Sequence, residues 1–156
     1  MTNSSSRTFL RTLRRLSPTD RDRLWELLRR WRRLYRVPAA AVVEVTIAGD
    51  DLLGELNRRW RRKAGPTDVL AFELGREEGE PAQVWLWGEV YVSLDRAREQ
   101  ARGRGVRVGE ELAALVAHGL LHLVGFDHKN MTGREEMDRA AAKLLKAPAA
   151  GNRGRA

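Results

Sequence analysis

The sequence predicts one domain that contains both helices and strands, because of its length and two kinds of hydrophobic pattern. Its 156 residues suit a single domain with one hydrophobic core. Five segments place apolar residues at helical spacing, and three segments have the alternating or aromatic and β-branched composition of strands. We expect the domain to comprise residues 1–147 and residues 148–156 to form a flexible basic tail.

The first helix is predicted at residues 17–36. Ser17 is a favourable N-cap, Pro18 is favourable at the first helical position, and apolar residues then recur at helical spacing. The segment before it, Arg7 to Leu13, fits either a short edge strand or the lead-in to a helix.

Residues 1–37 carry the whole positive excess of the chain. Eleven arginines and three acidic residues in this segment give a net charge of +8, which equals the formal net charge of the full sequence. Such a cluster attracts polyanions, and nucleic acid is the first candidate. An ordinary solvated helix face of an arginine-rich protein explains the same charge, so both interpretations stay open.

Residues 41–48 alternate apolar and polar side chains, which predicts a strand with one buried face. Gly49 and Asp50 are expected to turn the chain and cap a second helix. The apolar positions of this helix are Leu52, Leu53, Leu56 and Trp60.

Two more strands are predicted at residues 67–72 and 84–94, separated by a loop at residues 75–81. Gly88 is a possible β-bulge in the second of them. Trp85 and Trp87 are two residues apart and would share a face. Packing is the favoured interpretation of both, and a stacking platform for nucleobases is the alternative.

Three helices complete the expected element order. Residues 95–102 form the first, and a basic, glycine-containing loop at 103–109 leads to the second at 110–124. Thr132 to Glu135 has the pattern of a capping box for a last helix that runs through Lys146.

All three histidines of the chain lie between positions 118 and 128. His118 and His122 are four residues apart, which places both imidazoles on one face of a helix. Gly125 can end this helix in a left-handed conformation, and the turn would bring His128 toward the other two. A lone histidine on an apolar face is usually a core residue, but three that converge predict an open metal site.

Gly119 stands where helical zinc proteases carry a glutamate general base directly after the first histidine. Glycine inside a helix costs about 1 kcal/mol relative to alanine. We expect it to serve close backbone approach or to leave space for a substrate. Peptide hydrolysis by the glutamate-dependent mechanism is therefore disfavoured.

The segment from His118 to His128 resembles the signature of the YbeY family, His-Gly-x-Leu-His-Leu-x-Gly-[Tyr/Phe]-Asp-His. This family comprises bacterial metal-dependent endoribonucleases that are also described as ribosomal RNA maturation factors. The segments Leu56 to Phe72 and Gly88 to Ser93 resemble two further family patterns, and the likeness covers about residues 42–146. It implies an α+β fold in which about five helices flank a small mixed β-sheet. The metal site would lie on a helix of the C-terminal half and the turn after it.

Four features depart from the family pattern. Phe126 stands where tyrosine is more usual, Glu89 replaces an aspartate, and Ala71 replaces a common serine. The N-terminal region also has no clear counterpart to the first strand of the family. None of these departures touches the expected metal ligands.

The resemblance implies an endoribonuclease of the single-strand type that acts in the maturation of ribosomal RNA. His118, His122 and His128 would hold one Zn²⁺ per chain, which would lower the pKa of a bound water toward about 7. Arg61 matches the functional arginine of the family and would pair with the scissile phosphate. Asp127 would orient a ligand histidine or cap a turn.

The resemblance implies ribosomal RNA and ribosomal particles as partners, with other ribosome-associated proteins as further candidates. Without cysteine, and without an apolar run of the ~18 residues that a membrane span needs, we expect a soluble cytoplasmic protein. Two alternatives remain. One is a non-catalytic ribosome-assembly factor that docks on RNA, and the other is a metalloprotease-like hydrolase.

Overall fold

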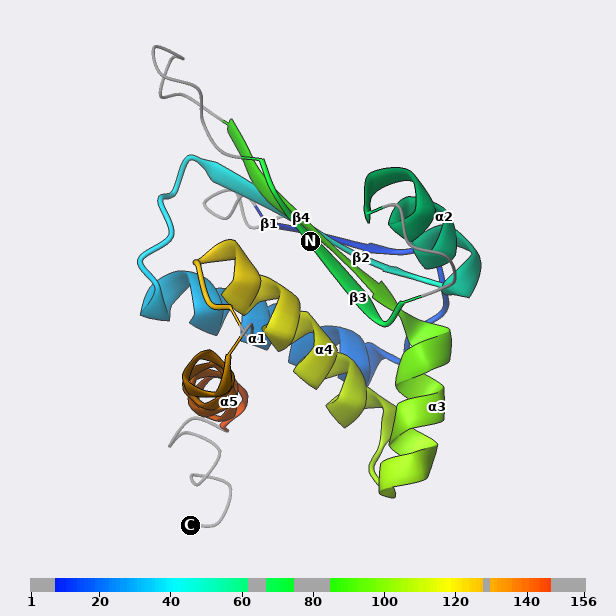
Figure 1. Ribbon diagram of the computed structural model, residues 1–156. Coiled ribbons are helices and arrows are strands. Elements are labelled where there is room, and N and C mark those ends of the chain that lie inside the picture. The colour runs from blue at the N-terminus through cyan, green and yellow to red at the C-terminus, as the bar shows by residue number, and fades with distance from the viewer. Residues whose placement is uncertain (1–7, 62–66, 75–84, 128–129, 147–156) are drawn as a thin grey trace.

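The computed structural model describes residues 8–61, 67–74, 85–127 and 130–146, and within these ranges the fold is α+β as expected. Helices α1 and α4 cover one face of the sheet, α5 packs on these two helices, α2 lies on the other face, and α3 runs beside α4 (Figure 1). The elements in chain order are β1 (Thr8–Thr12), α1 (Pro18–Leu34), β2 (Ala41–Ala48), α2 (Asp50–Arg61), β3 (Val69–Glu73), β4 (Trp85–Ser93), α3 (Leu94–Arg104), α4 (Val108–Leu123) and α5 (Met131–Leu145).

The sheet is mixed and has the strand order β1-β2-β4-β3. Strands β1, β2 and β4 are parallel, whereas β3 is antiparallel to β4 and forms one edge. The segment after Arg7 is a strand rather than a helix lead-in. The reason is long-range, because its residues from Thr8 to Thr12 pair with Val43 to Ile47 of β2.

A β-bulge interrupts the pairing of β2 with β4. Val42 pairs with Leu86 and Val43 with Gly88, so Trp87 is the extra residue, and the expected irregularity at Gly88 is confirmed. A Cβ on Gly88 would lie 2.6 Å from Leu123 Cδ2, so glycine lets α4 approach the strand. The loop at 75–81 and the side chain of Trp85 lie outside the described structure.

The main core lies between the sheet and helices α1, α4 and α5. Trp87 packs against it, with its ring centroid 6.0 Å from that of Trp31, which confirms the packing interpretation for this residue. A smaller cluster of Ala48, Leu53 and Leu70 lies under α2.

Trp60 was expected to be an apolar packing position, but it is 66% exposed. It lies one turn beyond Leu56, which is the last helix position packed against the small cluster. The indole meets the ring of Phe72 edge-on at the outer side of the sheet, with the ring centroids 6.4 Å apart.

The expected start of α5 and the expected end of α3 are wrong. Helix α5 begins at Met131 rather than at a Thr132 capping box, because the Asn130 side chain accepts the Gly133 N–H at 2.7 Å. Helix α3 runs through Gly103 to Arg104, and Gly105 ends it at φ 68°, so the loop before α4 is shorter than 103–109. A glycine in a left-handed C-terminal cap is a stronger stop than one inside the helix.

Asp50, the first residue of α2, is held by contacts with two other elements. Its backbone N–H donates to Asp95 Oδ2 of α3 at 2.9 Å, and its carboxylate accepts from Ser93 Oγ at 2.7 Å. The start of α2 is thus tied to the end of β4 and the start of α3. These contacts orient α2 and therefore position its last turn.

Several arginines of the basic N-terminal segment have structural partners. Arg14 pairs with Asp95 at 3.4 Å, and Arg21 donates to Thr12 Oγ1. Arg30 donates to the Leu144 carbonyl at the end of α5, and Arg32 donates to Thr8 Oγ1 and the Pro38 carbonyl. Burial lowers the pKa of Arg32. Part of the N-terminal charge therefore holds β1 and α5 against α1.

In the part of the chain that the structure describes, every helix is too short or too polar to cross a membrane.

Candidate metal centre

His118 and His122 lie one turn apart on α4 and are both half-buried. Their Nε2 atoms are 3.2 Å apart, and their ring planes meet at 71°. Two imidazole nitrogens bound to one tetrahedral zinc at 2.0–2.1 Å would be about 3.3 Å apart. The pair therefore has the nitrogen spacing that a chelated zinc requires.

The end of α4 turns the chain directly after the second histidine. Gly125 N–H donates to the His122 carbonyl and Phe126 N–H to the Leu121 carbonyl, both at 3.1 Å, which is a Schellman motif. Gly125 has the expected left-handed conformation, with φ 99°. The ring of Phe126 packs edge-on against Tyr35 of α1, with the ring centroids 5.9 Å apart. This packing also fixes the direction in which the chain leaves α4.

His128, the expected third ligand, lies outside the described residues. The described chain ends at exposed Asp127 and resumes at Asn130, which caps α5. A Cβ on Gly133 would collide with the Asp127 carbonyl oxygen, so the turn approaches α5 closely. Within the described ranges, three or more His, Asp or Glu side chains nowhere gather closely enough to hold a metal ion.

A cavity of about 340 Å³ opens beside the two histidines. It is formed by α4, by the last residue of α2, and by β3 with the two residues before it. Its lining consists of Arg61, Thr67, Asp68, Val69, Ala71, His118 and His122. The structure thus brings Arg61 into the same cavity as the histidine pair, although 57 positions separate it from His118.

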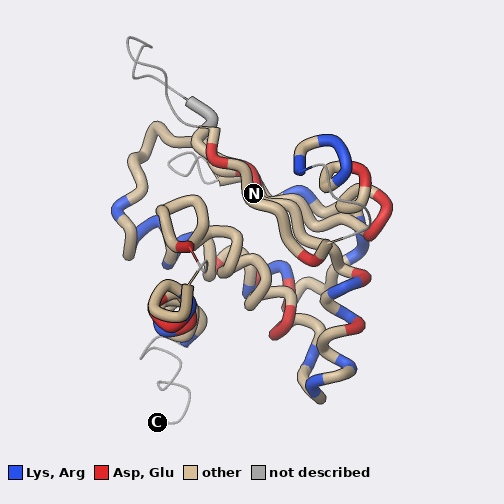
Figure 2. Tube along the Cα trace, in the orientation of Figure 1, with Lys and Arg blue, Asp and Glu red and all other residues tan. Residues whose placement is uncertain are grey.

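Arg61 is exposed at the end of α2, and it has no ion-pair partner among the described residues. Figure 2 shows that the first turn of α2 is acidic and its end is basic. The helix therefore delivers a guanidinium to the rim of the cavity, where it can bind an anion.

Asp68 and Thr67 also line the cavity, and the sequence did not identify them as site residues. The carboxylate of Asp68 accepts from Gln100 Nε2 at 3.2 Å, and its backbone carbonyl accepts from Ser93 N–H at 2.9 Å. The only sequence signal was their position as a polar pair at the start of a predicted strand, and in the structure they lie directly before β3 rather than in it. Ala71, where the family often has serine, faces the cavity as well.

Gly119 provides close approach between α4 and the sheet. A Cβ at this position would lie 2.5 Å from Val90 Cγ1 and 3.2 Å from Val69 Cγ2. A side chain directly after His118 would therefore run into β4 rather than project into the cavity. Of the two uses expected for this glycine, close packing is the one observed.

Gly119→Ala is expected to destabilise the protein by about 1–3 kcal/mol despite the better helix propensity of alanine. The added methyl group must displace Val90 or shift α4, and a shift of α4 moves both histidines. Chemical denaturation would give the loss of stability. Gly103→Ala on α3 is the matched control, because a Cβ there meets nothing within 4 Å. Equal or higher stability of Gly119→Ala would contradict the packing argument.

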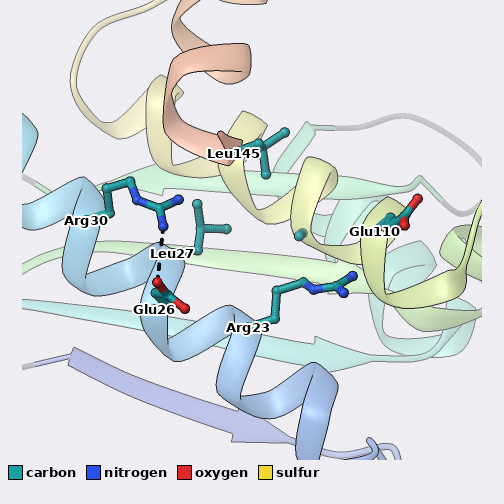
Figure 3. A pocket seen from close by; sticks show the side chains of 7 residues that line it. Arg23, Glu26, Leu27, Arg30, Glu110 and Leu145 are labelled. Atoms are coloured by element: carbon teal, nitrogen blue, oxygen red, sulfur yellow. Dashed lines mark hydrogen bonds and ion pairs between the residues drawn. The ribbon is translucent and has the colours of Figure 1, made fainter. Parts of the chain in front are cut away.

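A larger cavity of about 410 Å³ lies among α1, α4 and α5 (Figure 3). Its lining includes Arg23, Arg30, Glu26 and Glu110, and Arg30 pairs with Glu26 at 3.3 Å. Glu110 is in the first turn of α4, twelve residues or about 18 Å along the axis from His122. This cavity contains no histidine and is separate from the candidate metal centre.

Known proteins are similar to this chain in sequence and in fold. The family model described as endoribonuclease YbeY matches residues 17–148. A relative of that name from Anaeromyxobacter sp. (strain Fw109-5) is 41% identical over 109 residues, which are 70% of this chain and 55% of that protein. The relative from Bacillus subtilis (strain 168) is 40% identical over 113 residues, 69% of this chain and 72% of that protein.

The chain spans about half the length of the Anaeromyxobacter relatives, 55% and 54%. A solution structure from Thermotoga maritima has a TM-score of 0.59 and 28% identity, and the match covers 94% of this chain and 93% of that one. The family model includes both α2 and α4, which carry Arg61 and the two histidines to one cavity. The chain therefore belongs to the endoribonuclease YbeY family.

Proposed function

We propose that this protein is an endoribonuclease that hydrolyses RNA phosphodiesters with a zinc ion held by His118, His122 and His128. The observation that carries the proposal is the shared cavity, in which two imidazoles at zinc-chelating distance lie with an arginine that can bind phosphate. The relatives are endoribonucleases by name, which supports RNA as the substrate class.

The donor set fits zinc better than a hard cation. Imidazole nitrogens suit Zn²⁺, whereas Mg²⁺ and Ca²⁺ prefer oxygen ligands. Zinc bound in this way supplies Lewis acidity and lowers the pKa of water toward about 7. With three histidine ligands, one coordination position stays open to substrate or solvent, which is the arrangement of catalytic rather than structural zinc sites.

Arg61 binds and orients the substrate in this proposal. Its planar guanidinium can donate two parallel N–H bonds to the phosphate oxygens next to the scissile bond. Negative charge on these oxygens increases in the transition state, so the interaction strengthens as the reaction proceeds. Arg61 therefore both positions the phosphate and stabilises the transition state.

The substrate that we propose is single-stranded ribosomal RNA, cleaved during its maturation in the cytoplasm. The exposed arginines of the N-terminal segment, such as Arg29 and Arg33 on α1, would attract the RNA backbone. They do not line the cavity of the histidines, so their contribution is to affinity rather than to the chemistry.

Two alternatives predict different behaviour. A metalloprotease-like hydrolase needs a general base, and position 119 cannot supply one because a side chain there would meet Val90. A non-catalytic assembly factor would bind RNA through the same basic residues without hydrolysing it. The histidine pair, which shares its cavity with Arg61, favours hydrolysis over simple docking.

Removal of the metal tests the proposal directly. We expect chelation to abolish cleavage of a ribosomal RNA fragment that contains single-stranded segments, and about one equivalent of Zn²⁺ per chain to restore it. A peptide substrate should stay intact under both conditions. Peptide cleavage by the zinc-loaded protein would support the protease alternative, and RNA binding without cleavage would support the assembly factor.

A further inference from the structure

Another, smaller cavity lies on the opposite face of β3 from the histidines. Its volume is about 280 Å³, and three aromatic rings and two carboxylates dominate its lining. These residues are Trp60, Phe72, Tyr91, Glu73 and Glu89, and we call the site the aromatic cavity. It lies on the α2 face of the sheet, whereas the histidines approach from the α4 face.

The three rings form a continuous edge-to-face row. The centroids of Trp60 and Phe72 are 6.4 Å apart with an interplanar angle of 67°, and those of Phe72 and Tyr91 are 6.0 Å apart at 75°. Trp60 stands at the outer end and is 66% exposed. An exposed indole next to a cavity can stack on a flat ring, and such base–aromatic stacking contributes to the affinity of proteins for single-stranded nucleic acids.

The polar groups of the aromatic cavity select against a phosphate. Glu73 and Glu89 repel anions, but their oxygens accept hydrogen bonds from N–H groups. Tyr91 O–H donates to Glu89 Oε2 at 3.3 Å, and burial together with Glu89 raises the pKa of Tyr91, so it remains a donor. A flat ring with an amino substituent is the chemistry that this lining recognises.

The aromatic cavity and the histidine cavity are neighbours across one edge strand. Ala71 lines the histidine cavity and the next residue, Phe72, lines the aromatic cavity. The last two residues of α2 also line different cavities, since Arg61 lines the histidine cavity and Trp60 lines the aromatic cavity. A single strand of RNA at the β3 edge can therefore place a phosphate against Arg61 and the adjoining base against Trp60.

We propose that the aromatic cavity binds the unpaired nucleobase next to the phosphate held by Arg61, and that it prefers bases with an exocyclic amino group. The inference rests on the proposed function for the identity of the phosphate. It adds the subsite that makes the protein select unpaired RNA and sets its base preference. Trp60 provides the stacking surface, and Glu89 provides an acceptor for the amino group.

Binding to the zinc-free protein tests this inference without cleavage. The probes are short, fluorescently labelled oligo(C) and oligo(U), which differ at C4 by an amino group against a carbonyl. We expect tighter binding of oligo(C). Trp60→Ala should weaken its binding about tenfold, whereas Trp60→Phe should stay within about twofold of wild type. Glu89→Gln should shift the preference toward oligo(U).

Leu13→Ala is the matched control, because Leu13 is a similarly exposed apolar residue beyond the opposite edge strand β1. Equal affinity of Trp60→Ala and wild type for oligo(C) would overturn the inference, even if the zinc-loaded enzyme cleaves RNA. Conversely, Trp60-dependent preference for oligo(C) would support the inference even if no RNA is cleaved. The two proposals can thus fail separately.

Discussion

His122→Ala is expected to abolish zinc binding at this site and to lower the rate of RNA hydrolysis about a thousandfold. The substitution removes one of the two imidazoles whose Nε2 atoms are 3.2 Å apart, so the chelating pair is lost. Loss of a metal ligand costs more than the 10–100-fold in affinity that loss of a supporting residue costs. The metal supplies several kcal/mol of transition-state stabilisation, and each 1.36 kcal/mol corresponds to a factor of ten.

Three measurements check this expectation. Elemental analysis gives the zinc content, and a cleavage assay gives the rate of RNA hydrolysis. Thermal unfolding with and without zinc gives the stabilisation of the folded protein by zinc binding. At a zinc concentration 100 times the dissociation constant, wild type should gain about 2.7 kcal/mol of stability and His122→Ala should gain nothing. Glu110→Ala on the same helix is the control, since Glu110 is far from the pair. Full zinc occupancy and activity in His122→Ala would exclude this site as the metal centre.

Arg61→Ala is expected to lower kcat about 10²–10³-fold and to leave zinc binding unchanged. Removal of one preorganised donor to the developing negative charge typically costs this much. Arg61→Lys should recover part of the rate, because it restores the charge but not the two parallel hydrogen bonds. Single-turnover kinetics with saturating RNA separates this loss of chemistry from weaker binding.

Arg58→Ala is the matched control for Arg61. Both arginines are exposed near the end of α2, but only Arg61 lines the cavity of the histidines. Arg58→Ala should weaken RNA binding slightly and reduce its salt dependence, with kcat unchanged. If Arg61→Ala behaves in the same way, Arg61 is only a part of the basic surface, and the proposed role in the transition state is wrong.

Features that depend on near neighbours in the chain were predictable. The strand at 41–48 has the bounds of β2, and Ser17 caps α1 as expected. Gly125 ends α4 in the left-handed conformation, and the two histidines on α4 face each other. Each of these features depends on residues that lie within about one turn of one another, so the spacing of residues in the sequence predicts it.

Boundaries failed where two local signals competed. Both Asn130 and Thr132 can cap α5, and the structure uses Asn130. Both Gly103 and Gly105 can end α3, and only Gly105 lies where the left-handed conformation is needed. The choice depends on how the whole helix packs, which the local pattern does not contain.

By itself, the sequence determined the helix that carries His118 and His122, the turn that follows it, and the resemblance to the YbeY family. Only the tertiary structure decided which distant residues meet them. Arg61 shares the cavity because a hydrogen-bond network around Asp50, Ser93 and Asp95 directs α2 toward β3. Gly119 is needed because α4 packs on Val90, and Trp60 is exposed because its helix extends beyond the small cluster. These are contacts between separate elements, and the spacing of residues within any one element does not predict them.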